Sequence, residues 1–139
     1  IDPELHVRDI VIAQAACTNG SYANQYELPG TFAPIASFEL LEKAVAATRA
    51  SGANFKVGNI LSSDMFYDDA ASAMRWSKMG VLGIEMESAA LYCNAARLGK
   101  NGLCICTVSD SFNYPEENTT AEERQNSFTK MMEIALEIA

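Results

Sequence analysis

The sequence contains Val81-Leu82-Gly83-Ile84-Glu85-Met86-Glu87 and Leu103-Cys104-Ile105-Cys106-Thr107-Val108-Ser109-Asp110, two apolar runs that each end on acidic residues. Short continuous apolar runs are typical of buried strands, above all in parallel sheets covered by helices. In an open parallel sheet, ligands bind outside the carboxyl ends of the strands. We therefore expect both runs to bring their carboxylates to one edge of a sheet, at the rim of an active site.

Strand and helix patterns alternate around these runs. Strands are predicted over 7–16, 55–61, 81–86 and 102–109. Helices are predicted from Ser37 to Gly52, over 70–78 and 87–98, and from a capping box at Thr120 and Glu123 to the end of the chain. The polar stretch 18–34 reads as a long loop. This order predicts an α/β fold, with a largely parallel or mixed central sheet between helices, in the three-layer α/β/α arrangement.

Length and composition fit one globular domain, 1–139, since 49% of the residues are hydrophobic. The chain begins with Ile1 rather than Met and already enters a strand pattern at Val7, and its last helical pattern has no stop signal. We therefore expect the domain to be incomplete at the amino end, as the carboxyl-terminal portion of a longer one.

The net charge of −8, from 18 acidic and 10 basic residues, argues against nucleic acid and anionic membranes as partners. No apolar stretch reaches the ~20 residues of a membrane span. A cytoplasmic protein is the expectation.

The four cysteines contain no C-x-x-C pair, and the chain has one histidine, so no metal site is predicted. Cys104 and Cys106 lie two apart on a predicted strand and hence on one face. Small buried thiols, in a reducing compartment, are the interpretation that these residues favour.

Four segments stand in order along the chain: Gly58-Asn59-Ile60-Leu61-Ser62-Ser63-Asp64-Met65-Phe66-Tyr67, Gly83-Ile84-Glu85-Met86-Glu87-Ser88-Ala89-Ala90, Thr107-Val108-Ser109-Asp110 and Thr119-Thr120-Ala121-Glu122-Glu123-Arg124-Gln125. Together they resemble the carboxyl-terminal part of the hexameric, bacterial-type purine nucleoside phosphorylases, from about Leu5 to the last residue. The resemblance implies reversible phosphorolysis of purine ribo- or deoxyribonucleosides to free base and pentose 1-phosphate. Inorganic phosphate would be the co-substrate, with no cofactor.

The resemblance also implies roles for single residues. Asp110 would be the general acid at nitrogen 7 of the purine. Arg124 would assist it, and Ser109 would line the base site. An acid at this place suits the reaction, because negative charge develops on the departing base.

The remaining implied positions surround the base and the sugar. Phe66 would stack on the base and Ile84 would pack against it. Met86 would lie along the sugar, and Glu87 would accept hydrogen bonds from the pentose hydroxyls, as a carboxylate can. Glu85 would either help to hold the sugar or order the loop.

The residue types alone leave structural alternatives open. An acid at the start of a helix, as Glu87 is, is favoured by the helix dipole in any protein. Asp110 also fits a turn after a strand, and Arg124 a surface ion pair with Glu123 or Asp110. Phe66 and Met86 are residue types common in cores.

Family features are also missing. The arginines, serine and glycine turn that hold phosphate in the family lie upstream of the resembling segment, so this chain alone is not expected to bind phosphate productively. The resemblance implies a homohexamer, a trimer of dimers. A uridine phosphorylase and a methylthioadenosine-type nucleosidase remain as alternatives, as does a non-catalytic fragment that binds purine or forms oligomers.

Overall fold

The computed structural model describes residues 1–126 and 128–139, and it has a four-stranded sheet in the order β3-β2-β1-β4. The strands are β1 (Ile10–Thr18), β2 (Phe55–Ser62), β3 (Ile84–Glu85) and β4 (Cys104–Thr107). β1 pairs with β2 in parallel and β2 with β3 in parallel, whereas β4 runs antiparallel to β1. The sheet is therefore mixed.

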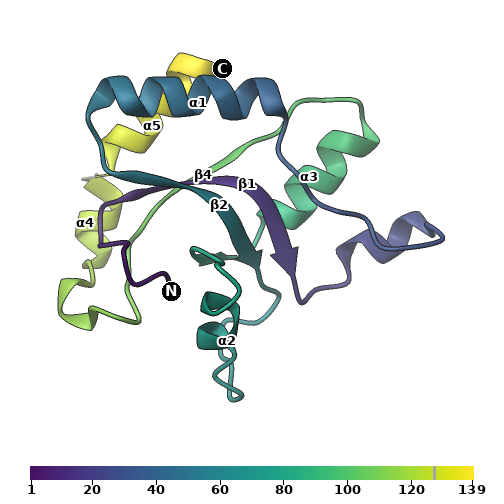
Figure 1. Cartoon of the computed structure of the whole chain (residues 1–139), viewed down its shortest axis with the longest axis horizontal. Helices are drawn as coiled ribbons and strands as arrows, with labels where there is room; N and C mark the ends of the chain where they lie inside the picture. The colour runs from purple at the N-terminus through teal and green to yellow at the C-terminus, as the bar shows by residue number, and fades with distance from the viewer. Residues whose placement is uncertain (127) are drawn as a thin grey trace.

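Helices flank this sheet, as the predicted α/β fold requires. They are α1 (Phe38–Ser51), α2 (Ala73–Ser77), α3 (Ser88–Arg97), α4 (Ala121–Asn126) and α5 (Thr129–Ile138), with 3₁₀ turns η1 (Tyr22–Tyr26) and η2 (Pro115–Glu117). Figure 1 shows α1 and α5 together above the sheet and α2 below it. Among the described helices, none is long and apolar enough to cross a membrane.

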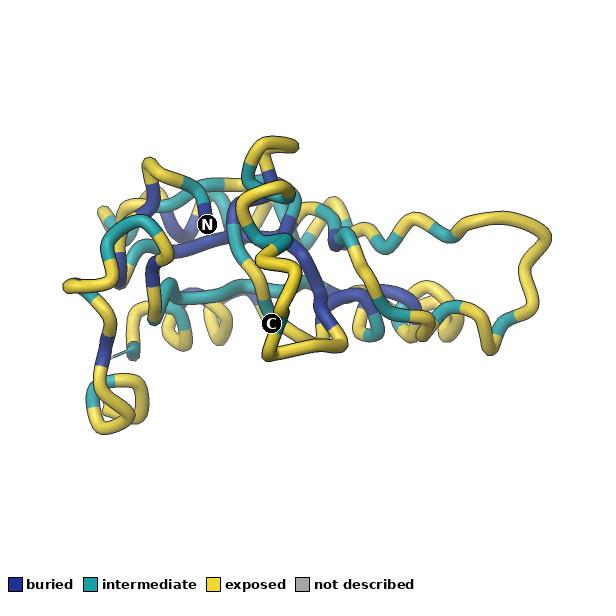
Figure 2. Tube along the Cα trace, turned by 90° about the horizontal axis from the view of Figure 1, so that it is seen from below, coloured by how far each residue is buried: buried dark blue, intermediate teal, exposed yellow. Residues whose placement is uncertain are grey.

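Successive side chains of β1 point to opposite faces of the sheet, so the strand contributes to two separate hydrophobic cores. Ile10 and Ile12 pack with the α1 and α5 positions Ala44, Ala47, Ile134 and Ile138. Val11 and Ala13 pack on the other face with Ile60, Leu82, Ala89 and Tyr92. Figure 2 shows that burial follows the central strands, while the loops at both ends of the molecule are exposed.

The direction of β4 corrects the expectation that both acidic strand ends meet at one sheet edge. Thr107 pairs with Ile10 at the start of β1, whereas Glu85 pairs with Ser62 at the end of β2. Asp110 and Glu85 thus arrive from opposite ends of the sheet. Alternation of strands and helices predicts parallel pairing, but an edge strand can join such a sheet in either direction.

Several element boundaries differ from the predictions. The strand predicted over 81–86 is reduced to β3, although Leu82 still donates its N–H to the carbonyl of Asn59 at 2.8 Å. The strand predicted over 7–16 begins only at Ile10, because Arg8 has a left-handed backbone with φ of 80°. The final helix is described as α4 and α5, and its predicted residue Ser127 lies outside the described residues.

The predicted helix from Ser37 to Gly52 is confirmed as α1, although Ser37 makes no side-chain cap. Its Oγ instead accepts from the N–H of Gly102 at 2.9 Å, which ties the helix start to the segment before β4. Gly52 ends the helix in the left-handed conformation, with φ of 71°. A glycine adopts this backbone without steric cost.

The hydroxyl of Tyr92, on α3, joins the helix to two strands. It donates to the carbonyl oxygen of Ala13 and accepts from the N–H of Cys104 at 3.0 Å. Tyr92 is 1% exposed, and burial raises its pKa, so the phenol keeps the proton that it donates. The hydroxyl thereby satisfies two backbone groups where β4 begins.

We expect Tyr92→Phe to destabilise the chain by about 1–3 kcal/mol, because the substitution removes both hydrogen bonds of a buried hydroxyl. The free energy of unfolding, measured by urea titration, tests this. Tyr67→Phe is the matched control, since Tyr67 is 88% exposed. Equal urea midpoints for the two variants would show that the hydrogen bonds of the Tyr92 hydroxyl do not stabilise the fold.

Candidate active site

A cleft of about 960 Å³ lies on the sheet face opposite α1 and α5, over Val11, Ile60 and Cys106. All the candidate site residues that the sequence suggests line this cleft. These residues are Phe66, Ile84, Glu85, Met86, Glu87, Ser109, Asp110 and Arg124. A volume of this size is in the range of small-molecule sites. The cleft crosses the face of the sheet, so residues from both ends of the strands reach it.

The carboxyl group of Asp110 lies at one end of the cleft, and its neighbours anchor it through one of its two oxygens. Arg124 Nη1 donates to Asp110 Oδ2 at 3.0 Å, and Ser109 Oγ donates to the same oxygen at 2.7 Å. Among the described residues, no hydrogen bond engages Oδ1. The arrangement fixes the carboxyl plane and leaves one oxygen for a ligand in the cleft.

The segment from Ser109 to Arg124 is closed into a hairpin by its own polar groups. Thr119 donates both its N–H and its hydroxyl to the carbonyl oxygen of Ser109, at 3.0 and 2.9 Å. Thr120 Oγ1 accepts from the N–H of Glu123 at 3.2 Å, which is one half of the predicted capping box. These contacts set the distance between Asp110 and the start of α4.

The segment before β1 fastens this hairpin from outside the cleft. His6 Nδ1 lies 2.9 Å from Glu117 Oε1, and its ring stacks on Tyr114 with centroids 4.5 Å apart. Arg8 pairs with Glu123, so the second half of the capping box does not form. The hydrogen bond with His6 holds the pKa of Glu117 below its usual value.

Glu85 orders the turn into α3 rather than facing the cleft with free oxygens. Its Oε2 accepts from the backbone N–H groups of Glu87 and Ser88 at 2.8 and 2.7 Å, and its Oε1 accepts from Ser88 Oγ. A carboxylate on the first N–H groups of a helix satisfies donors that have no partner within the helix. Of the two roles open for Glu85, the geometry favours ordering the loop.

Glu87 occupies the N-cap position of α3 without capping it. Its side chain is exposed, and among the described residues its carboxylate makes no hydrogen bond. Ile84 and Met86 are 39% and 42% exposed and line the cleft beside it. The cleft here combines an acceptor group with an apolar wall.

Phe66 also lines the cleft and is 78% exposed, with its ring edge-to-face to Tyr67 at a centroid distance of 5.1 Å. A core role for Phe66, one of the alternatives left open by the sequence, is therefore wrong. An exposed ring on a cleft wall is a surface on which a planar ligand can stack.

Asn19 is a cleft residue that sequence reasoning missed. Its Nδ2 donates to Ser63 Oγ at 3.0 Å, and its Oδ1 accepts from the N–H of Asp64 at 3.0 Å. It thereby fixes the segment that carries Phe66. The only signal in the sequence was Asn19-Gly20, which is equally typical of a plain surface turn.

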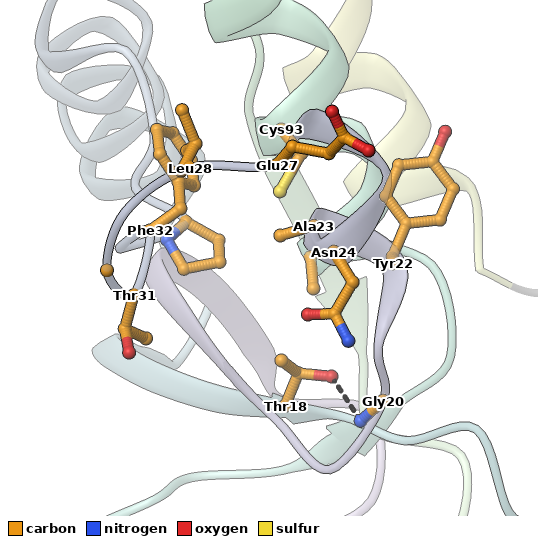
Figure 3. Close-up of a pocket in the computed structure, with 13 residues that line it drawn as sticks. Thr18, Gly20, Tyr22, Ala23, Asn24, Glu27, Leu28, Thr31, Phe32 and Cys93 are labelled. Atoms are coloured by element: carbon orange, nitrogen blue, oxygen red, sulfur yellow. Dashed lines mark hydrogen bonds between the residues drawn. The ribbon is translucent and has the colours of Figure 1, made fainter.

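A second cavity, of about 350 Å³, lies between the 18–34 loop and α3. Figure 3 shows loop residues such as Asn24 and Leu28 around it, with Cys93 of α3 on its wall. The hydroxyls of Tyr22 and Tyr26 both reach Asn94 Oδ1, at 3.1 and 2.9 Å. The loop therefore packs on α3, the helix whose N-cap residue is Glu87.

Across residues 1–126 and 128–139, no three His, Cys, Asp or Glu side chains gather in a way that would hold a metal ion. The cleft offers acids, one arginine, hydroxyls and apolar surface.

The sequence matches the model of the phosphorylase superfamily over residues 1–139, and the chain belongs to that family. Three similar proteins are described as purine nucleoside phosphorylase DeoD-type. The one from Clostridium novyi is 56% identical over 141 residues, covering 100% of this chain and 60% of the relative. Those from Streptococcus pyogenes and Streptococcus pneumoniae are 49% and 46% identical, covering 99% of this chain and 58% of each relative. The chain thus spans about three fifths of the length of these relatives.

We expect Glu85→Gln to loosen the turn into α3, because an amide offers one acceptor oxygen where the carboxylate uses two. The loss should be about 1–2 kcal/mol of unfolding free energy. It should also speed amide hydrogen exchange at Glu87 and Ser88. Glu42→Gln, on the exposed face of α1, is the control. Unchanged exchange at both amides would contradict the capping role.

The lowered pKa of Glu117 predicts an acid-sensitive hairpin. Its contribution is complete above the usual value of 4.5 and is lost as the pH falls through the lowered folded-state value. Amide exchange at Val7, whose N–H donates to Glu117 Oε2, should therefore accelerate below pH 4.5. In Glu117→Gln this pH dependence should vanish, and its persistence would assign the effect to another group.

Proposed function

We propose that the protein to which this chain belongs is a purine nucleoside phosphorylase, which converts a purine nucleoside and phosphate into free base and pentose 1-phosphate. One observation carries the proposal: a single cleft joins the anchored carboxyl group of Asp110, the exposed ring of Phe66 and the free carboxylate of Glu87. The similarity to DeoD-type purine nucleoside phosphorylases over the whole chain supports the same activity.

Asp110 would act on the base. Cleavage of the glycosidic bond leaves negative charge on the purine, and a proton or hydrogen bond at nitrogen 7 stabilises it. Arg124 and Ser109 hold Oδ2, so Oδ1 is the oxygen placed to carry the proton toward the base. Arg124 also supplies positive charge where negative charge develops, which stabilises the transition state.

Glu87 would bind the sugar. Its carboxylate can accept hydrogen bonds from two neighbouring pentose hydroxyls at once. Met86 and Ile84 would provide apolar surface against the sugar and the base, and Phe66 would stack on the base, since all three line the cleft. Glu85 would act indirectly, by holding the backbone N–H of Glu87.

Further properties belong to the same proposal. We infer that inorganic phosphate is bound mainly by residues outside this chain and that no cofactor is needed. A homohexamer built as a trimer of dimers, a role in purine salvage and a cytoplasmic location are in keeping with the proposed activity. The relatives are named phosphorylases and the chain covers 58–60% of their length, which supports a phosphate site formed largely outside this chain.

The proposed acid can be tested by substitution in the full-length protein. We expect Asp110→Asn to lower turnover of inosine by at least about 100-fold, because an amide cannot transfer the proton. Asp69→Asn, at an exposed position outside the cleft, is the matched control. Hypoxanthine release, followed with and without phosphate, is the measurement, and near-normal turnover of Asp110→Asn would reject the role.

The same assay separates the activities that the sequence left open. Release of hypoxanthine only when phosphate is present supports the phosphorylase. Release without phosphate would identify a nucleosidase, and cleavage of uridine in preference to inosine would identify a uridine phosphorylase. A folded full-length protein that cleaves none of these nucleosides would overturn the proposed activity and leave a binding or assembly role.

A further inference from the structure

Two thiols lie next to each other on β4, and one of them, Cys106, is at the floor of the cleft. Cys104 and Cys106 stand two residues apart on β4 and therefore point to the same face of the sheet. Their Sγ atoms lie 3.5 Å apart. Both side chains are partly exposed, both pack at the margin of the core around Tyr92, and Cys106 lines the cleft. The proposed phosphorolysis uses neither thiol.

The pair has the chemistry of a dithiol rather than of two separate cysteines. Within reach of one another, the sulfurs share a hydrogen bond. In this hydrogen bond Cys104 is the donor and Cys106 is the acceptor. The hydrogen bond therefore raises the pKa of Cys104, which stays protonated, and lowers the pKa of Cys106. Because the thiolate is the reactive form of cysteine, Cys106 is the nucleophilic member of the pair.

The separation of the sulfurs suits one bridging atom better than a direct disulfide. A disulfide needs an S–S distance of about 2.05 Å, and its Cα atoms are rarely more than about 6.8 Å apart. Residues two apart on a strand have Cα atoms about 6.6 Å apart, at the upper limit. If one atom were bonded to both sulfurs at about 2.3 Å, the present 3.5 Å between the sulfurs would give a bond angle of about 100° at that atom.

The surroundings restrict which atom this is. A structural zinc ion needs four ligands, and the described residues contain no third His, Cys, Asp or Glu placed to complete a site. The carboxylates of Glu85 and Glu87 act on both thiols through their negative charge, which disfavours an anionic ligand. The site therefore fits a neutral, thiol-seeking group that is satisfied by two sulfurs.

We propose that Cys104 and Cys106 form a binding site for monosubstituted trivalent arsenicals. Arsenic(III) is pyramidal, and with one organic substituent it takes two sulfur ligands. In the reaction, the As=O group of an organic arsine oxide is replaced by two As–S bonds, and the oxygen leaves as water with the two thiol protons. No atom is oxidised or reduced.

Occupation of this site would also affect the cleft, an inference that rests on the proposed function. The organic group of the arsenical would project from Cys106 into the space between Glu87 and Asp110, which the nucleoside is proposed to fill. Arsenical and nucleoside should therefore exclude each other.

Phenylarsine oxide and the full-length protein provide the test. Intact mass spectrometry should show one phenylarsenic adduct per chain, with loss of one water. Excess 2-mercaptoethanol should not remove the adduct, whereas 2,3-dimercaptopropanol should. Fragmentation should place the arsenic on the peptide that contains Cys104 and Cys106. An adduct at other cysteines alone, or none, would overturn the site.

Single substitutions show whether both sulfurs take part. Cys104→Ser and Cys106→Ser should each weaken binding by more than about 100-fold. Each variant keeps only one As–S bond, whereas in the wild type the second bond forms within the same chain at a high effective concentration. Cys17→Ser should bind as the wild type does. Undiminished binding by Cys104→Ser would contradict the proposal. Peptide mapping of the wild type decides the question if a variant does not fold.

The competition arm separates the two proposals. Inosine should slow formation of the adduct, and the adduct should abolish inosine cleavage. A protein that binds phenylarsine oxide at Cys104 and Cys106 but has no nucleoside-cleaving activity would overturn the proposed function and leave the dithiol site standing. Full cleavage activity in the fully modified protein would overturn the mutual exclusion.

Discussion

The pairing of β1 on both of its edges is the constraint on which the rest of the structure depends. Ile10–Ala13 are almost completely buried, so each backbone N–H and C=O there must find a partner. β2 supplies one edge along the whole strand, and β4 supplies the other as far as Ala13. Beyond Ala13, Pro34 accepts from the N–H of Ala16 and Ala36 donates to the carbonyl of Gln14, which ties the end of the 18–34 loop to β1.

This pairing decides where a site can form. One face of the sheet is covered by α1 and α5, while the other is only partly covered by α3, and the cleft occupies the remainder. Because β4 is antiparallel to β1 and β3 is parallel to β2, the chain delivers Asp110 from one end of the sheet and Glu87 from the other. A ligand between them would lie across the sheet, over Val11, Ile60 and Cys106.

The functional candidates are held by contacts that leave their cleft-facing groups available. Asp110 is anchored through one oxygen, and Glu87 is positioned through its backbone N–H by Glu85. Behind them, His6 and Arg8 fasten the hairpin and α4 through Glu117 and Glu123. Exposed ion pairs of this kind contribute little stability one by one, so their effect here is on position. The same open face leaves the Cys104–Cys106 thiol pair within reach of the cleft.

The sequence by itself determined the α/β class, α1 with its glycine end, the family and the set of residues that gather in the cleft, because periodicity, turn residues and short motifs are local. Tertiary structure alone decided that β4 is antiparallel, that β3 keeps two residues, that Arg8 rather than Thr120 takes the Glu123 side chain, and that Asn19 supports the Phe66 segment. Each of these depends on a partner far away in the chain, and no local pattern encodes which distant group will satisfy a given backbone edge or carboxylate.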